Sequence, residues 1–308
     1  MNSINNLFIE KNLIMESIAY TYFDPLDYLC ESIDILLEED NNDNKNANAN
    51  NDKDDLKEND KRFNFDAKKA IADMIRILIQ WFTRLKDTMS AFFKGFRNLN
   101  HKKLIKEIFV DPNKHKKKIK VYNYINMRNG VANANELINK ASSILNNAIK
   151  AKNPSMEDYK QQVIRAFDID SLGGGALKAR TYLCFIKKNE KIKITIGQLN
   201  EQIVSSYLLG ANDTVNNIER WKNDLRSTMQ KTDMDIYQQF RAGEMDQKTS
   251  RQFTSLLKTH TGIVEKICVY SMKCIKKAYS DFNRIVTKGN GTTENIENNE
   301  NSNDNNEK

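Results

Sequence analysis

The chain has 308 residues and a net charge of +7, and its three prolines and eleven glycines are too few for the many turns of a β-sandwich or β-barrel. Its four cysteines and three histidines show neither a CxxC pair nor metal-ligand spacing, which argues against a disulfide scaffold and a zinc site. We therefore expect a mainly α-helical protein in a reducing compartment, with no metal and no cofactor.

The positive charge is concentrated in the middle of the chain. Residues 62–287 carry a net charge of +20, whereas residues 1–38, 39–61 and 288–308 carry −6, −4 and −3. A basic core between acidic flanks indicates a polyanionic partner, or flanks that shield the core from one.

The first 62 residues are predicted to form two regions. Within the N-terminal segment 1–38, residues 12–38 have the pattern of a short amphipathic helical segment, with Asp24 and Pro25 at a helix start. Residues 39–62 are rich in Asn and Asp and contain almost nothing to bury, so we expect a disordered acidic linker. The tail, residues 288–308, has the same character, and the composition of both tracts also fits an AT-rich genome.

Neither a signal peptide nor a membrane-spanning segment is visible. The first 20 residues lack a basic region followed by an apolar one. No stretch of about 18 uncharged apolar residues occurs anywhere in the sequence. We therefore expect neither secretion by a signal peptide nor a transmembrane helix.

The most pronounced helical pattern covers residues 66–98, with Asp66 as a candidate N-cap. A wide apolar face opposite a lysine-rich face is typical of a core helix with a solvated side, and also of a helix that lies on a membrane surface. The aromatic residues of the candidate membrane or partner face are Trp81, Phe82, Phe92, Phe93 and Phe96.

A basic stretch follows between Lys94 and Lys120 and is the strongest functional signal in the sequence. Clustered lysines neutralise phosphates, and lysine in place of arginine favours non-specific contact with a nucleic-acid backbone. The alternative is a solvated surface. The candidate polyanion-binding residues are Lys94, Arg97, Lys102, Lys103, Lys106, Lys114, Lys116, Lys117, Lys118 and Lys120.

The middle of the chain is predicted to be less helical. A short strand is expected at 119–125, followed by helices at about 132–151 and from Ser155 onward, where Ser155 and Asp158 resemble a capping box. Gly173, Gly174 and Gly175 indicate a turn or loop. Residues 181–186 and 191–196 are expected to pair as a small β-hairpin.

Helical patterns return after Gly197, at 199–209, 212–230 and 247–287. The last two are long and joined by a short polar segment, which predicts an antiparallel pair. We therefore expect residues 63–287 to form one basic core domain, a bundle of long, coiled-coil-like amphipathic helices.

No catalytic constellation is recognisable. The triple glycine lacks the Lys-Ser/Thr pair of a Walker loop and the GxGxxG spacing of a dinucleotide fold. His260 lies on the apolar face of the predicted last helix, where a histidine is more often part of the core than a general base. The pair Asp168 and Asp170 has no recognisable partner. We therefore expect no enzymatic activity.

The layout of residues 12–98 resembles virion structural or internal proteins of large tailed bacteriophages. The similarity lies in Ile14-Met15-Glu16-Ser17, the acidic linker, and the helix containing Ile79-Gln-Trp-Phe-Thr-Arg-Leu-Lys and Phe92-Phe-Lys-Gly-Phe-Arg. Ile14-Met15-Glu16 also resembles the Ile/Leu-x-Glu site cut by the prohead proteases of such phages, as does Leu36-Leu37-Glu38. The resemblance implies processing at Glu16 and a location in the virion or the cytoplasm of the producing cell.

Three functions remain open at this point. The first is a non-enzymatic virion structural or internal protein whose basic core contacts DNA non-specifically, or other virion proteins. The second is a peripheral protein that binds an anionic membrane surface through residues 66–98. The third is a cytoplasmic protein that binds nucleic acid non-specifically. None of the three involves a small-molecule substrate.

Overall fold

The computed structural model describes residues 56–97, 118–151, 155–195, 208–241 and 247–290, and within them the chain is mainly α-helical, as the sequence predicts. The predicted N-terminal segment, linker residues 39–55, residues 199–207 of the helix predicted at 199–209, and the tail beyond Asn290 lie outside these residues, while Leu208 and Leu209 are described and not helical. None of the described helices has a stretch long and apolar enough to cross a membrane.

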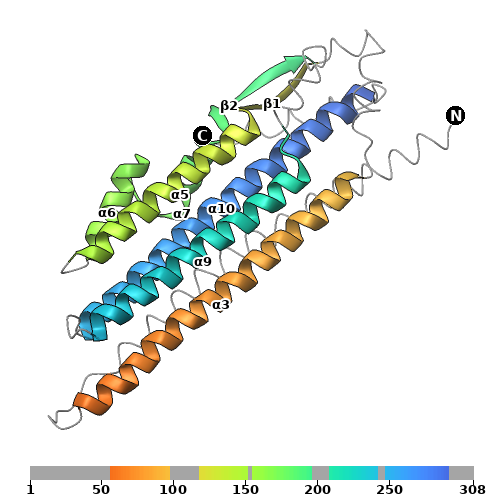
Figure 1. Cartoon of the computed structure of the whole chain (residues 1–308). Coiled ribbons are helices and arrows are strands. Elements are labelled where there is room, and N and C mark those ends of the chain that lie inside the picture. Colours follow the sequence, from red (N-terminus) through yellow and green to blue (C-terminus); the bar gives the residue numbers. More distant parts are fainter. Residues whose placement is uncertain (1–55, 98–117, 152–154, 196–207, 242–246, 291–308) are drawn as a thin grey trace, which may run out of the picture.

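Helix α10 (Gln247–Asn290) is the element against which the other elements pack (Figure 1). Every residue from His260 to Lys276 except Lys266 is buried, so this part of the helix is enclosed on all sides. The elements that contact it are α3 (Leu56–Arg97), β1 (Lys118–Tyr124), α5 (Met127–Lys150), α6 (Met156–Phe167), α7 (Gly174–Leu183) and α9 (Ala211–Arg241).

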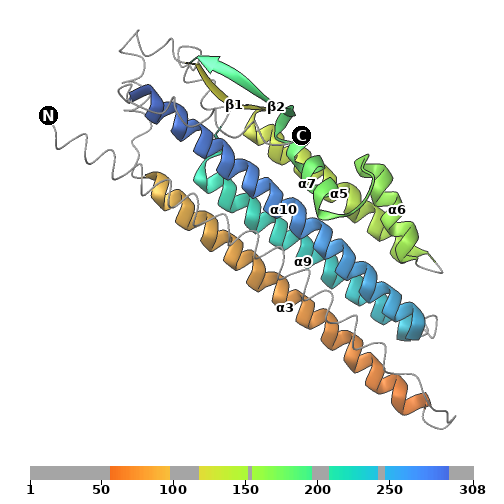
Figure 2. The ribbon, with the colours of Figure 1, turned by 180° about the vertical axis from the view of Figure 1, so that it is seen from behind.

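The helices lie on two sides of α10. Helices α9 and α3 lie side by side in both views, and α5, α6 and α7 cover the opposite side (Figures 1 and 2). Helices α9 and α10 run antiparallel, which confirms the helical pair predicted from the last two patterns. A bundle of long helices is therefore the framework that holds every other feature of the molecule.

Helix α3 is longer than predicted and its apolar face belongs to the core. It begins at Leu56, so Asp66 is inside the helix rather than its N-cap, and residues 56–62 are helical rather than linker. The candidate membrane or partner face was wrong, because the side chains that define it fill the space between α3 and its neighbours. Trp81, Phe82, Phe92 and Phe93 are buried, and the side chain of Phe96 lies outside the described part of the helix.

The two described strands form an antiparallel ribbon at one end of the bundle (Figure 1). Strand β1 confirms the strand predicted at 119–125, and β2 spans Ile186–Thr195. The predicted hairpin was wrong: residues 181–183 end helix α7, and β2 pairs with β1 across the intervening helices. A short apolar run such as 181–186 fits a buried helix as well as a strand, so periodicity alone did not separate the two.

The predicted glycine loop was also wrong. Gly173 is the N-cap of α7, and Gly174 and Gly175 form its first turn. The break between the helices comes earlier in the chain, at Asp168. This residue has a left-handed backbone (φ 55°) and ends α6. The start of α6 follows the prediction, because the Ser155 hydroxyl accepts a hydrogen bond from the Asp158 amide.

Gly130 permits a close contact between α5 and Phe185, the residue before β2. A Cβ atom at Gly130 would lie 2.4 Å from Cδ1 of Phe185, a fully buried residue between α7 and β2. The Phe185 carbonyl accepts a hydrogen bond of 2.9 Å from the Ile125 amide, which ties the two chain segments together. The ring therefore has little room to move.

We expect Gly130→Ala to destabilise the protein by about 1–3 kcal/mol, because the added methyl group displaces the Phe185 ring. Gly175→Ala is the matched control, since its Cβ would meet nothing within 4 Å. It should be neutral or stabilising by up to about 1 kcal/mol. Urea unfolding of both variants measures the difference. Equal stability of Gly130→Ala and the parent protein would contradict this packing.

Candidate functional site: a basic face on the ribbon

The ribbon places lysines from two distant segments on one face. Lys120 lies opposite Lys193, Tyr122 opposite Lys191, and Lys118 opposite Thr195. Residues directly opposite each other share a face with their Cβ atoms about 5 Å apart, and residues two apart on one strand share it at about 6.8 Å. We call Lys120, Lys191 and Lys193 the lysine face.

The residues between these lysines point the other way. Val121 lies opposite Ile192 on the second face of the ribbon. Val121 is only 2% exposed, whereas Lys120, Lys191 and Lys193 are exposed. The alternation of Ile and Lys therefore separates an apolar face from a basic one.

Helix α10 fixes the ribbon through three polar groups. The Tyr124 hydroxyl donates a 2.7 Å hydrogen bond to the Asp281 carboxylate, and the Arg284 guanidinium donates a 2.7 Å bond to the Lys120 carbonyl. Arg284 also contacts the Asp281 carboxylate at 3.3 Å. Burial, followed by the adjacent Asp281 charge, raises the pKa of Tyr124 well above its usual range, so the phenol keeps its proton and donates. We call these three residues the ribbon clamp.

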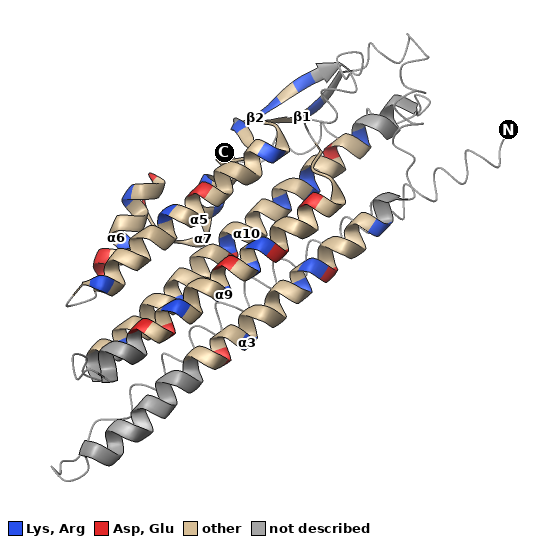
Figure 3. Cartoon of the chain, in the orientation of Figure 1, with Lys and Arg blue, Asp and Glu red and all other residues tan. Residues whose placement is uncertain are grey.

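Positive charge on the lysine face is poorly compensated. Lys120, Lys191 and Lys193 make no ion pair with any carboxylate whose side chain the structure describes. Like charges directly opposite each other destabilise an antiparallel pair. Figure 3 shows the basic residues of β1 and β2 beside the end of α10. The ribbon thus offers a polyanion a set of cations that have no carboxylate partner among the described side chains.

Only part of the basic stretch predicted from the sequence is placed by the structure. Lys120 is on the lysine face, Lys118 is the first residue of β1, Lys94 is exposed, and Arg97 is the last residue of α3. Lys191 and Lys193 were missed as site residues. The alternation at 191–196 already predicted a strand with one solvated face. The sequence pattern does not indicate which strand pairs with it. The predicted residues outside the described part are Glu16, Lys102, Lys103, Lys106, Lys114, Lys116 and Lys117.

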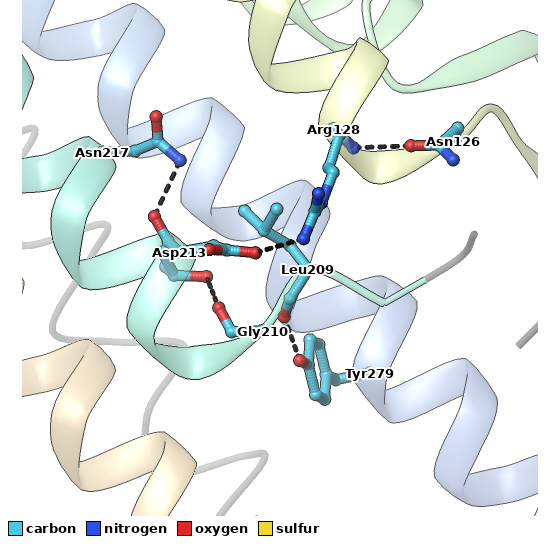
Figure 4. A network of polar contacts seen from close by, with 8 residues as sticks. Asn126, Arg128, Leu209, Gly210, Asp213, Asn217 and Tyr279 are labelled. Atoms are coloured by element: carbon cyan, nitrogen blue, oxygen red, sulfur yellow. Dashed lines mark hydrogen bonds and ion pairs between the residues drawn. The ribbon is translucent and has the colours of Figure 1, made fainter. Parts of the chain in front are cut away.

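A second polar network lies nearby and joins the starts of two helices to α10 (Figure 4). The Arg128 guanidinium of α5 contacts the Asp213 carboxylate of α9 at 3.1 Å. The Asn126 side chain caps α5 by accepting from the Arg128 amide, and the buried Tyr279 hydroxyl donates to the Leu209 carbonyl. These groups satisfy each other, which indicates a structural role.

His260 lies in a buried polar cluster between α5, α6 and α10. The Tyr159 hydroxyl is 3.0 Å from its Nδ1 and the Ser142 hydroxyl is 3.4 Å from its Nε2. A neutral imidazole donates from one ring nitrogen and accepts at the other, so it serves both hydroxyls. Burial lowers the pKa of His260 to about 4. The cluster contains no carboxylate to orient the ring, and these contacts support the prediction of a core histidine.

The buried thiols and the carboxylates show no reactive arrangement within the described residues. Burial raises the pKa of Cys184, Cys268 and Cys274, which keeps these free thiols protonated. The described His, Cys, Asp and Glu side chains form no group of three or more that would hold a metal ion. The lysine face is therefore the feature with the clearest binding chemistry.

Comparison of the chain with models of protein families, with curated proteins and with solved structures finds no match in any of the three. The chemistry that the protein offers a ligand is therefore inferred from the geometry of the lysine face and the distribution of charge.

We expect the buried state of His260 to make stability depend on pH. The pKa is about 4 in the folded chain and 6.5 for an exposed histidine, so between these values the unfolded chain binds more protons. Stability is fully present above pH 6.5, falls as the pH decreases toward 4, and loses about 3 kcal/mol in total.

Urea unfolding of the parent protein and of His260→Asn between pH 7.5 and 4.5 measures this dependence. The Asn side chain cannot titrate but can still accept from Tyr159, and the other titrating groups cancel in the difference between the two proteins. Stability should fall more steeply with decreasing pH in the parent. Parallel pH profiles would contradict the buried neutral imidazole.

Proposed function

We propose that this protein is non-enzymatic and binds double-stranded DNA without sequence specificity through its lysine face. The observation that carries the proposal is the pairing of Lys120 with Lys193, two exposed ammonium groups on one face of a two-stranded ribbon. Their repulsion lowers the stability of the ribbon, and a bound polyanion relieves it. A surface that is unfavourable for folding and favourable for an anion supports a binding role.

The chemistry of the face favours backbone phosphates over base edges. Lysine is a point charge on a flexible stem and neutralises a phosphate without the bidentate geometry that arginine uses to read guanine. The spacing of about 6.8 Å along a strand and about 5 Å across it forms a small array of cations, which suits a repeating chain of phosphates. A two-stranded ribbon is also narrow enough to enter the major groove.

The resemblance of residues 12–98 to proteins of large tailed phages supports a virion structural or internal role within this proposal. DNA packed in a virion has no unique sequence at most contacts, so non-specific backbone binding suits it. A cytoplasmic protein of a cell with an AT-rich genome would use the same face. The membrane alternative is disfavoured, because its aromatic residues are buried in the bundle.

The double variant Lys120→Gln with Lys193→Gln tests the proposal. Duplex DNA of unrelated sequence is titrated with protein at several salt concentrations, and the logarithm of the affinity is plotted against the logarithm of the salt concentration. We expect steep salt dependence for the parent protein. The slope should fall by about 2 in the double variant, because each lost phosphate contact lowers it by about 1.

The matched control is Lys150→Gln with Lys231→Gln, which removes the same charge from exposed positions outside the ribbon, on α5 and α9. It should weaken binding slightly and leave the slope nearly unchanged. Equal slopes for the two double variants would show that only the overall charge matters. No binding by the parent protein at low salt would refute the proposal.

A further inference from the structure

Tyr122 lies between two lysines that come from different elements. The Lys191 ammonium of β2 lies 5.6 Å from the centroid of the Tyr122 ring, and the Lys277 ammonium of α10 lies 5.0 Å from the same centroid. An ammonium group within about 6 Å of a ring centroid is attracted by the negative face of the ring. One aromatic ring therefore holds Lys191 of the lysine face together with Lys277 of α10.

The ring itself is well fixed. Tyr122 is half-buried and pairs with Lys191 in the ribbon, and its ring makes an edge contact with the Tyr124 ring at 6.2 Å. Tyr124 is held in turn by its 2.7 Å hydrogen bond to Asp281. The ribbon clamp thus positions Tyr122, and through it both ammonium groups, relative to α10.

Two ammonium groups at one ring repel each other, and this repulsion is relieved when an anion binds between or beside them. The Tyr122 hydroxyl makes no hydrogen bond to any group that the structure describes and can donate one. Two cations and one neutral donor around a rigid ring match the needs of a phosphate group. Its charge requires compensation, and its oxygens accept several hydrogen bonds.

We propose that Lys191, Lys277 and the Tyr122 hydroxyl form a discrete binding site for one phosphate group of the DNA backbone. The proposal rests on the proposed function and adds a contact that the ribbon alone does not provide. Because Lys277 belongs to α10, this site fixes the angle of the bound duplex relative to the bundle, whereas the lysine face supplies the rest of the attraction. Tyr122 acts mainly as a positioning residue for the two ammonium groups.

Three variants test the site in the same titration with duplex DNA. Lys277→Gln should lower the salt slope by about 1, the value for one lost phosphate contact. Tyr122→Leu removes the ring, releases both lysines, and should lower the slope at least as much. Tyr122→Phe keeps the ring and should leave the slope unchanged while weakening binding a few-fold through loss of the hydroxyl.

The control is Lys231→Gln, which removes one exposed lysine on α9. If Lys277→Gln gives the same slope as this control while the Lys120/Lys193 double variant lowers it, the phosphate site is refuted and the lysine face stands. If the parent protein binds no DNA, both proposals fail. Thermal unfolding of each variant checks the fold. Lys277→Gln and Tyr122→Phe are small changes that keep the test decisive if Tyr122→Leu does not fold.

Phospholipid headgroups also carry phosphate, so vesicles of phosphatidylserine and phosphatidylcholine form a second arm. We expect weak vesicle binding that does not depend on Lys277. If Lys277→Gln abolished vesicle binding and left DNA binding intact, the site would recognise a membrane surface, and its assignment to DNA would be wrong.

Discussion

Enclosure of helix α10 on all sides constrains the rest of the molecule. A helix with no solvated side needs neighbours around its whole circumference, and α3, α9, α5, α6 and α7 provide them. Even polar residues in its buried span have to be accommodated. His260 is satisfied by two hydroxyls, one from α5 and one from α6. The hydrophobic contacts of one helix thus determine where all the others lie.

The ribbon depends on the same helix in another way. A two-stranded ribbon is marginally stable alone, and this one also carries like charges opposite each other. The apolar face with Val121 contributes burial, and the ribbon clamp supplies two hydrogen bonds between the ribbon and α10. Since the clamp residues Asp281 and Arg284 lie on α10, the basic surface and the bundle core are parts of one structure.

Local patterns predicted the helices well and the ribbon poorly. The 3.6-residue periodicity of 247–287 gave α10 within a few residues, and the Ser155 cap gave the start of α6. The start of α3 was placed ten residues late, because the polar residues before Asp66 carry no apolar pattern. The glycines at 173–175 favoured a loop by their conformational freedom, but Gly174 and Gly175 form the first turn of α7, where the Leu177 amide donates a hydrogen bond to the Gly173 carbonyl.

The candidate site shows why long-range pairing escapes such reasoning. Lys118 and Lys120 were recognised from their place in a basic stretch, and the wet face of residues 191–196 was recognised from its alternation. Nothing local to either segment states that they pair, since about 60 residues and three helices separate them. Lys277 is harder still to recognise as a candidate site residue. It follows two buried lysines, Lys273 and Lys276, on a helix whose apolar pattern predicts a core position.

The arrangement of the lysine face shows how stability and binding oppose each other in this chain. Replacing one lysine of the Lys120–Lys193 pair by a neutral residue would remove a repulsion and stabilise the ribbon, so the pair has no evident value for folding alone. The clamp and the cation–π contacts of Tyr122 hold the strands together despite this repulsion. An unfavourable repulsion on one surface, offset by contacts from a neighbouring helix, is typical of a functional site. The position of that strain, on an exposed face rather than in the core, points to a ligand that supplies negative charge.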